Sequence, residues 1–382
     1  MEQTIKTAER LLEMQKTPDT PEAIKTLPLL QRSDLRKEIQ TIPREVDVLE
    51  NATVLFHDLF TSGIAYIDVG FNLHVLTADD LPWVSLLGSM LLEMGTKKED
   101  FSSLAQRIAQ KTGGIYASPI HTAPEGSKES VSHLFLRGKC MVDQTQELFN
   151  ILSDILFEPS FDQQKRFKEI LLEQKAEMES GLIPNGHSAV LSRIKAHYHE
   201  SARAAEAMGG IDALLFHREI AKRIDSDWPE ILKRIQQILQ KILSAGLVIN
   251  ITADAKDRRD IEKSLEQFLC QFSGKDTAEL IPWNFTESPP ESEALLISSR
   301  VNYVGAGTNL FDNGYKMDGS ALVITKYLRT AWLWEQIRVQ GGAYGAVCAF
   351  DPNCGSFALA SYRDPNLTDT LEAYAKTGEF LK

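Results

Sequence analysis

Apolar and polar residues follow two spacings along this chain of 382 residues, one typical of strands and the other typical of helices. Residues 64–73 alternate like a half-buried strand, whereas residues 162–180 repeat apolar positions every three or four residues. Predicted strands cover residues 54–56, 64–73, 132–136 and 247–251, and predicted helices cover residues 81–94, 101–111, 143–156 and 162–180, followed by a helical region from 187 to 240. Strands and helices are therefore interspersed, which indicates a mixed fold.

The C-terminal part predicts a long helix that runs through two glycines into a pair of strands. Apolar residues recur at helical spacing over residues 320–338. Gly341 and Gly342 end this helix, because glycine tolerates the backbone angles that follow a helix C-terminus. Alternation then resumes and predicts strands at 345–350 and 356–362, joined by a turn of Asp, Pro, Asn, Cys and Gly.

The same order of elements occurs twice. A strand containing Tyr66 leads through helices to a Gly-Gly-Ile-Tyr sequence that ends at Tyr116, and a strand predicted to contain Tyr303 leads through the long helix to a Gly-Gly-Ala-Tyr sequence that ends at Tyr344. The chain therefore carries an internal repeat of unequal lengths. The first copy continues for about 155 residues after its tyrosine, but only 38 residues follow Tyr344. We therefore expect on the order of a hundred residues to be absent from the C-terminal end of the second copy.

These patterns predict an α+β fold with two related α/β modules, each a mainly antiparallel sheet packed with helices. A chain of this length favours more than one core. The predicted parts are a linker of short helices at 1–45, a first module at 46–275, an acidic proline-bearing linker at 276–294, and an incomplete second module at 295–382.

Composition excludes several classes of protein. Hydrophobic residues make up 43% and charged residues 25% of the chain, which is ordinary for a soluble globular protein. The net charge of −12 argues against nucleic acid as a partner, because phosphate contacts need basic clusters. No apolar run approaches the ~18 residues that span a membrane, so we expect no membrane partner.

Arg338 and Tyr344 are the candidate catalytic residues. They lie six residues apart, on either side of the two glycines, so both side chains could reach one point above the predicted sheet. A guanidinium and a phenol there could hold a peptide carbonyl and the oxyanion that it becomes during hydrolysis. The alternative remains open that Arg338 solvates carbonyls at a helix end and that Tyr344 packs in the sheet.

No metal site is predicted in this chain. Neither a His-x-x-Glu-His nor a His-Glu-x-x-His sequence occurs anywhere in it. The nearest candidate pairs His197 with His199, but residues two apart point to different sides of a helix, so both cannot easily bind one metal ion.

Several longer strings carry a family resemblance over nearly the whole chain. They occupy residues 54–66, 91–96, 111–115, 179–187, 208–210, 338–345 and 361–366. In these strings the chain resembles the pitrilysin/insulinase-type clamshell zinc metallopeptidases, in their presequence-protease branch. The resemblance implies two half-shells, each of two related α/β domains, joined by a helical hinge. Residues 1–45 would be the hinge end, and the two modules would form the C-terminal half-shell.

The resemblance also implies a function. This chain would supply half of a zinc metalloendopeptidase that degrades unfolded peptides such as targeting presequences. Zinc would be bound by the missing N-terminal half, on an inverted His-x-x-Glu-His helix, so this chain alone would be inactive. Arg338 and Tyr344 would contact the substrate backbone near the scissile bond, and Gly341 and Gly342 would also bind substrate. The partners would be peptide substrates and an N-terminal half-shell, in cis or in trans.

Two other functions stay open from the sequence. The chain could be a non-catalytic subunit that partners a separate zinc-bearing chain, or a peptide-binding remnant of a broken gene. For location, the expectation is the cytoplasm of a bacterium or an organelle matrix of a eukaryote.

Overall fold

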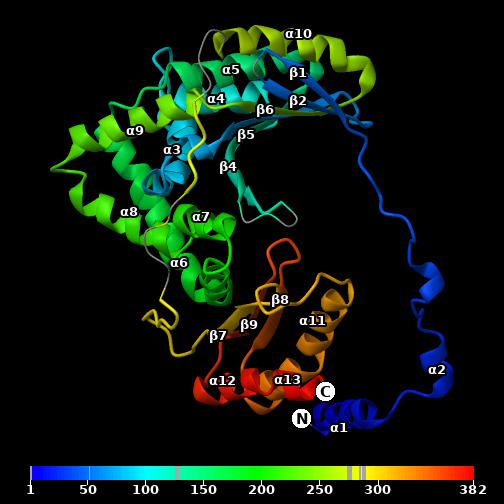
Figure 1. The fold of residues 1–382 in the computed structure, drawn as a ribbon. Coiled ribbons are helices and arrows are strands. Elements are labelled where there is room, and N and C mark those ends of the chain that lie inside the picture. The colour runs from blue at the N-terminus through cyan, green and yellow to red at the C-terminus, as the bar shows by residue number, and fades with distance from the viewer. Residues whose placement is uncertain are drawn as a thin grey trace. The chain divides into compact units, whose positions relative to one another are not determined.

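The computed structural model describes residues 2–50, 52–124, 127, 129–272, 278–283, 285 and 290–382, and the chain forms two compact units, 1–42 and 43–382 (Figure 1). Part of the predicted linker at 276–294 lies outside the described residues. The predicted boundaries of the linkers and modules stay predictions.

The first unit consists of short helices without a core. Its elements are helix α1 (Glu2–Lys16), helix α2 (Pro21–Lys25) and a 3-10 turn at Arg32–Asp34. Every residue from Gln3 to Ile42 is exposed. Hydrogen bonds between residues close in sequence therefore stabilise the helices of this unit. For example, the Thr20 hydroxyl accepts a hydrogen bond of 3.2 Å from the backbone N–H of Ala23 at the start of α2.

A six-stranded sheet organises the first part of the second unit. Its strands are β1 (Glu45–Leu49), β2 (Ala52–Asp58), β3 (Ile64–Asn72), β4 (Ile115–Thr122), β5 (Val131–Met141) and β6 (Leu247–Ala253). They lie in the order β1-β2-β6-β3-β5-β4, and every neighbouring pair is antiparallel except β2–β6. In β3 the alternating residues Ala65, Ile67 and Val69 are fully buried, so one face of the sheet forms the core.

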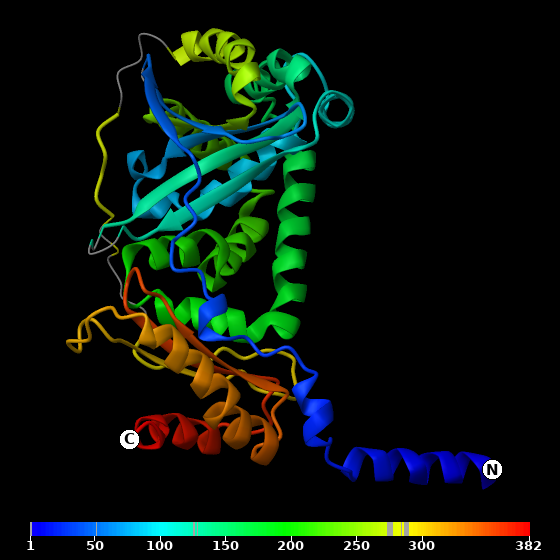
Figure 2. The same ribbon diagram turned by 90° about the vertical axis from the view of Figure 1, so that its right-hand side faces the viewer.

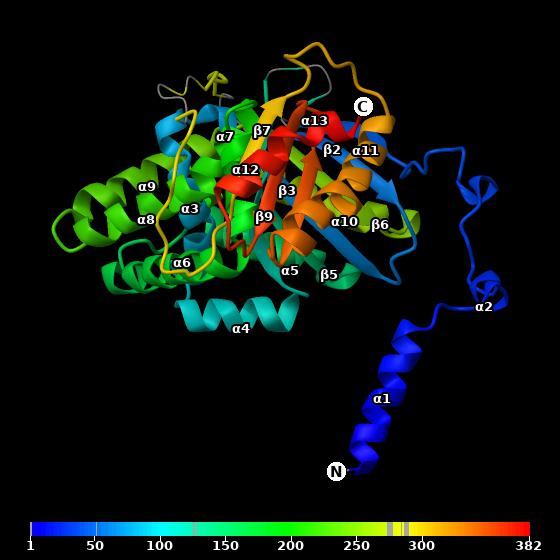
Figure 3. The same ribbon diagram turned by 90° about the horizontal axis from the view of Figure 1, so that it is seen from below.

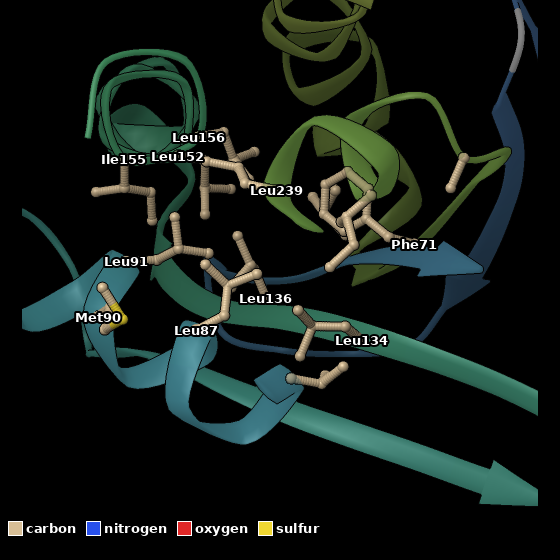
Figure 4. Close-up of a cluster of buried hydrophobic side chains, with 14 of the residues drawn as sticks. Phe71, Leu87, Met90, Leu91, Leu134, Leu136, Leu152, Ile155, Leu156 and Leu239 are labelled. Carbon is tan, nitrogen blue, oxygen red and sulfur yellow. The ribbon is translucent and has the colours of Figure 1, made fainter. Parts of the chain in front are cut away.

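Helices provide the other side of this core. They are α3 (Pro82–Glu93), α4 (Phe101–Lys111), α5 (Thr145–Phe157), α6 (Gln164–Lys195), α7 (Glu200–Gly209), α8 (Ile211–Arg223), α9 (Trp228–Leu243) and α10 (Arg258–Leu269). Figure 4 shows Leu87 of α3, Leu152 of α5 and Leu239 of α9 near Leu136 of β5, and all but Leu239 are at most 1% exposed. Burying such side chains on both sheet and helices is what stabilises the module.

A smaller sheet follows. It contains β7 (Gly305–Asn309), β8 (Gly345–Phe350) and β9 (Ser356–Tyr362) in the antiparallel order β7-β9-β8. Its helices are α11 (Ser320–Thr330), a π-helical segment (Trp334–Gln340), α12 (Thr368–Ala375) and α13 (Thr377–Phe380) (Figure 3). Leu333, Ile337, Ala343 and Leu359 belong to a second, smaller hydrophobic core.

The long helix α6 packs against this smaller sheet (Figure 2). The approach is close, because a Cβ atom at Gly305 would overlap Val190 and one at Gly307 would overlap Ile194. Glycine is therefore required at both positions of β7 by the neighbouring helix. The Gly305-Ala306-Gly307 sequence therefore reflects the close packing of β7 against α6.

The two sheets share one topology. In the larger sheet the strand before the Gly-Gly sequence, β3, pairs with β5, which pairs in turn with β4. In the smaller sheet β7, β9 and β8 repeat this arrangement in the same chain order. The internal repeat is therefore visible in strand pairing as well as in sequence, and the predicted α+β fold with mainly antiparallel sheets is confirmed.

Three predicted elements differ from the structure. Tyr303 precedes β7 rather than lying in a strand, and α6 continues to Lys195 through a kink at Asn185, where φ is −120° and ψ is 21°. The helix predicted at 320–338 is broken at Ala331, where φ is −107° and ψ is −79°. Leu333 and Ile337, which follow the break, are both buried, and the apolar spacing gave no sign of the break itself. In the part of the chain that the structure describes, none of the helices has both the length and the apolar character that a membrane span requires.

Candidate functional site

The candidate site lies where the π-helical segment turns into β8. Gly342 has a φ of +77°, in the left-handed region that glycine enters without a Cβ penalty. Its backbone N–H donates to the carbonyl of Arg338 over 3.1 Å, and that of Ala343 donates to Ile337 over 3.0 Å. Ala343 is only 4% exposed, so the turn is held by a buried residue placed between the glycines and Tyr344.

Arg338 lies against two aromatic rings. Its guanidinium carbon is 4.6 Å from the ring centroid of Trp334 and 5.3 Å from that of Tyr344. Its Nη1 donates to the backbone carbonyl of Tyr344. Within the described residues, no carboxylate comes within ion-pair distance of this guanidinium. Since a guanidinium carries five N–H donors, most of those on Arg338 remain available to a ligand.

Tyr344 presents its ring and hydroxyl at the surface. The residue is 63% exposed. Its ring contacts that of Tyr362 edge-on, with 5.4 Å between the ring centroids. The structure shows no hydrogen bond from its hydroxyl to any described residue. The sequence-predicted pair, Arg338 and Tyr344, is therefore brought together with free donors; the catalytic role of each stays a prediction.

Gly341 and Gly342 shape the turn itself. A Cβ on Gly341 would come within 2.7 Å of the Ile337 carbonyl oxygen. The Gly341 carbonyl also accepts a hydrogen bond of 2.6 Å from Nδ2 of Asn366. Both glycines therefore have a structural reason to be present. Their predicted contact with substrate stays a prediction.

Residues 361–366, for which the sequence predicts no contact with substrate, form a second wall of the site. The backbone N–H of Tyr344 donates to the carbonyls of Tyr362 and Arg363, over 3.0 and 3.3 Å. Asp364 is fully buried; its carboxylate accepts from the N–H of Asn366 over 2.9 Å and from the hydroxyl of Thr370 over 2.7 Å. The string 361–366 in the family resemblance was the available signal, but only strand pairing shows that it meets Tyr344.

An aromatic cluster joins this wall to the kink in α6. The ring of Tyr362 lies 4.8 Å from His187 and 6.0 Å from Tyr303, measured between centroids. The Tyr303 hydroxyl donates to the Ile183 carbonyl, and its ring lies over Gly186, where a Cβ would overlap it. The kinked part of α6 therefore packs against Tyr303 and against Tyr362, the ring that meets Tyr344.

The kink also borders a pocket of about 310 Å³ between α6 and the junction of α7 and α8. Its lining includes Gly181 and Asn185 from one string of the family resemblance and Gly209 and Gly210 from another. Residues from both strings therefore line the same pocket. Arg338 and Tyr344 are not among its lining residues.

The described part of this chain offers no set of ligands for zinc. Among the described residues, no group of three or more His, Cys, Asp and Glu side chains could hold a metal ion. His199 uses Nδ1 to accept a 3.0 Å hydrogen bond from the N–H of Ser201, and so caps α7. Burial raises the pKa of the Cys140 and Cys348 thiols to about 12, which keeps both protonated.

Comparison with known proteins places these features in a wider context. Residues 1–220 match the family model of the domain associated with peptidases of family M16, subfamily C, and residues 292–382 match that of the PreP C-terminal domain. The chain is 40% identical to presequence protease 1, chloroplastic/mitochondrial, of Arabidopsis thaliana over 98% of its length, and 25% identical to a mitochondrial presequence protease of Danio rerio over 98% of its length. It spans 35% and 39% of the lengths of those two proteins.

Solved structures share the fold. A conserved protein from Enterococcus faecalis matches 88% of this chain and 79% of its own chain with a TM-score of 0.60 at 15% identity. A peptidase M16 inactive domain from Pseudomonas fluorescens matches 88% of this chain and 79% of its own with a TM-score of 0.54 at 17% identity. At these identities the likeness concerns the fold alone.

Proposed function

Because this chain belongs to the family of domains associated with M16 peptidases of subfamily C, we propose that it forms the C-terminal half-shell of a zinc metalloendopeptidase that degrades unfolded peptides such as targeting presequences. The observation that carries the proposal is the contact between the half-buried Arg338 and the exposed Tyr344, whose remaining donors have no partner among the described residues. The proposal extends to this chain the activity named for its relatives, of which it covers about a third.

In this function the two side chains recognise the peptide backbone. The free N–H groups of Arg338 and the hydroxyl of Tyr344 donate to a carbonyl oxygen of the substrate near the scissile bond. They bind that oxygen more strongly when it carries negative charge in the tetrahedral intermediate, and so stabilise the transition state. Every peptide has such carbonyls, so recognition of this kind tolerates many sequences. Gly341 and Gly342 lack side chains beside the pair and allow an extended chain to approach it.

The catalytic metal belongs elsewhere in the proposed enzyme. We place the zinc site in an N-terminal half-shell outside residues 1–382, supplied in cis or in trans, because the described residues here offer no ligand set. Residues 1–382 alone are then inactive. By analogy with the chloroplastic/mitochondrial relative, the proposed location is an organelle matrix in a eukaryote, or the cytoplasm in a bacterium.

The test is cleavage of a short unstructured peptide by residues 1–382, alone and mixed with a zinc-bearing N-terminal half-shell, each with and without a chelator. Activity only in the mixture, and only without chelator, is the expected result. In the active mixture, Tyr344→Phe lowers kcat by ~10²–10³, the usual effect of losing one oxyanion donor, with a smaller change in KM. Tyr116→Phe, at the repeat-related position of the first module, is the matched control and leaves kcat unchanged.

Two outcomes would contradict the proposal. Chelator-sensitive cleavage by residues 1–382 alone would show that the metal site is in this chain. An unchanged kcat for Tyr344→Phe would remove its role in the transition state.

A non-catalytic subunit is the second candidate, favoured by the likeness to a domain described as inactive. Under that function, residues 1–382 would bind peptides, yet Arg338→Ala and Tyr344→Phe would leave the turnover of its zinc-bearing partner unchanged. Cleavage and binding measured on the same variants therefore separate the two functions.

A further inference from the structure

We propose that Arg363 is a second cationic contact of the Arg338–Tyr344 site and that it binds a carboxylate of the substrate peptide. This inference rests on the proposed function, since it names a chemical preference of the same site. Three observations support it: the backbone of Arg363, the lack of an ionic partner for it among the described residues, and a comparison between the two modules.

The backbone of Arg363 is held in an unfavourable conformation. Its φ of +51° lies in the left-handed region, where a residue with a Cβ atom is strained. Neighbouring contacts impose this geometry: Asp364 and Asn302 exchange two backbone hydrogen bonds, of 2.7 and 2.9 Å, and the Asp364 carboxylate is fully buried. Glycine or asparagine would satisfy the same backbone at lower cost, so the turn itself does not call for arginine.

The first module contains an arginine at the corresponding position. Tyr116, which ends the first Gly-Gly-x-Tyr sequence, stands opposite Arg137 in the β4–β5 register. In the second module the β8–β9 pairing ends with Gly345 opposite Tyr362, and Arg363, the next residue, accepts a hydrogen bond of 3.3 Å at its carbonyl from the N–H of Tyr344. The repeat therefore puts an arginine beside the corresponding tyrosine in both modules.

The two arginines differ in their partners. Arg137 is neutralised by Asp68 of β3, with Nε–Oδ1 and Nη2–Oδ2 distances of 3.1 and 3.2 Å. On the corresponding side of Arg363 the chain offers Asn302 and Tyr303, which carry no charge. Over the described ranges, no carboxylate forms an ion pair with Arg363. One module thus pairs this arginine internally, and the other leaves it exposed and open to a ligand.

Arg363 is also in contact with the site. Its guanidinium carbon lies 5.4 Å from the ring centroid of Tyr362, and that ring contacts the ring of Tyr344. Arg338 lies against the other tyrosine of the pair, Tyr344, in the same way. Two guanidinium groups, neither of them paired with a described carboxylate, therefore lie against one pair of contacting tyrosines.

A carboxylate is the ligand that suits this arrangement. A guanidinium binds a carboxylate through paired, charge-assisted N–H···O bonds. A peptide substrate carries carboxylates at its C-terminus and on acidic side chains. The protein has a net charge of −12, which repels acidic peptides in general, so a local cation beside the binding residues gives such peptides a specific contact.

The test measures binding rather than cleavage, so it needs no metal. Residues 1–382 are titrated against a fluorescently labelled unstructured peptide by anisotropy, in four versions: a C-terminal acid or amide, each with one internal Glu or Gln. Arg363→Asn removes the charge while keeping a residue that tolerates positive φ. The expected result is a loss of about tenfold in affinity, the order of one charge-assisted contact, for the peptides that carry the recognised carboxylate. The peptide with neither carboxylate binds wild type and variant equally.

Control variants separate charge recognition from folding. Arg363→Lys restores part of the preference, because it keeps the charge but loses the paired geometry. Arg329→Gln, an exposed arginine on α11 of the same module, changes none of the four affinities. An effect confined to the acid/amide pair identifies the C-terminal carboxylate, and one confined to the Glu/Gln pair identifies an acidic side chain.

Other outcomes overturn the inference. If Arg338→Ala and Tyr344→Ala weaken all four peptides while Arg363→Asn weakens none, the carboxylate contact is wrong and the proposed function stands. If Arg363→Asn weakens all four equally, the residue positions the site without reading charge, which also refutes the inference. If wild-type residues 1–382 bind none of the four, the inference and the peptide-binding role on which it rests both fail.

Discussion

Acidification should destabilise the first module through His121. This side chain lies on β4, where Nδ1 is 3.2 Å from the Ser132 hydroxyl and Nε2 is buried without a hydrogen-bond partner among the described residues. Burial lowers the pKa of His121 from 6.5 to about 4. A buried imidazole without a second partner cannot easily accept a charge, so the folded protein holds it neutral.

The change in the free energy of unfolding with pH follows from the difference in proton binding between the folded and unfolded chain. The folded pKa lies below the unfolded one, so the unfolded chain takes up a proton first, and stability is lost as pH falls from about 6.5 towards 4. The full difference corresponds to about 3.4 kcal/mol. Between pH 7.5 and pH 5.0 this one group removes about 2 kcal/mol from the free energy of unfolding, because at pH 5.0 the unfolded imidazole is almost wholly protonated and the folded one is not.

The assay is urea unfolding of wild type and His121→Asn at both pH values. Asparagine keeps a polar atom near Nδ1 for Ser132 but does not titrate. Its absolute stability can differ from that of wild type at each pH; the measured quantity is the loss between the two pH values, which should be about 2 kcal/mol smaller in the variant. An equal loss in both proteins would show that His121 is hydrated or paired in solution and would refute the reasoning.

Two further predictions concern the turn that holds the candidate site. Gly342→Ala should destabilise the second module by about 1–2 kcal/mol in urea unfolding, because alanine at a φ of +77° is strained. Gly345→Ala is the control, because a Cβ there meets nothing within 4 Å. This control should change the free energy of unfolding by less than about 0.5 kcal/mol. Asp364→Ala should cost about 1–3 kcal/mol, since it removes the acceptor for the N–H of Asn366 and the hydroxyl of Thr370; a thermal unfolding midpoint equal to that of wild type would contradict it.

Local patterns predicted the elements that depend on local forces. The helix at 101–111 and the strands at 345–350 and 356–362 occur with the predicted bounds, because helix periodicity, alternation and turn residues act over a few neighbouring positions. The contact between Arg338 and Tyr344 was also within reach of the sequence, since both residues belong to one short helix–turn–strand connection.

Elements that depend on distant partners were predicted less well. The break at Ala331 places Leu333 in the core and leaves Trp334 49% exposed, and a regular helical spacing cannot show which residues a sheet will accept. The sequence separated the helix at 162–180 from the helical region that begins at 187, whereas the structure joins them into α6. That helix packs against β7 and β9, which lie more than a hundred residues further along the chain.

The candidate site divides in the same way. The sequence by itself determined the family, the mixed fold, the repeat, and the two residues on either side of Gly341 and Gly342. Only the tertiary structure decided that Arg363 lies beside Tyr344 and that no described carboxylate pairs with it as Asp68 pairs with Arg137. Strand register brings residues together across the sheet, and the free energy that fixes register comes from side chains packing on both faces, which no short stretch of sequence contains.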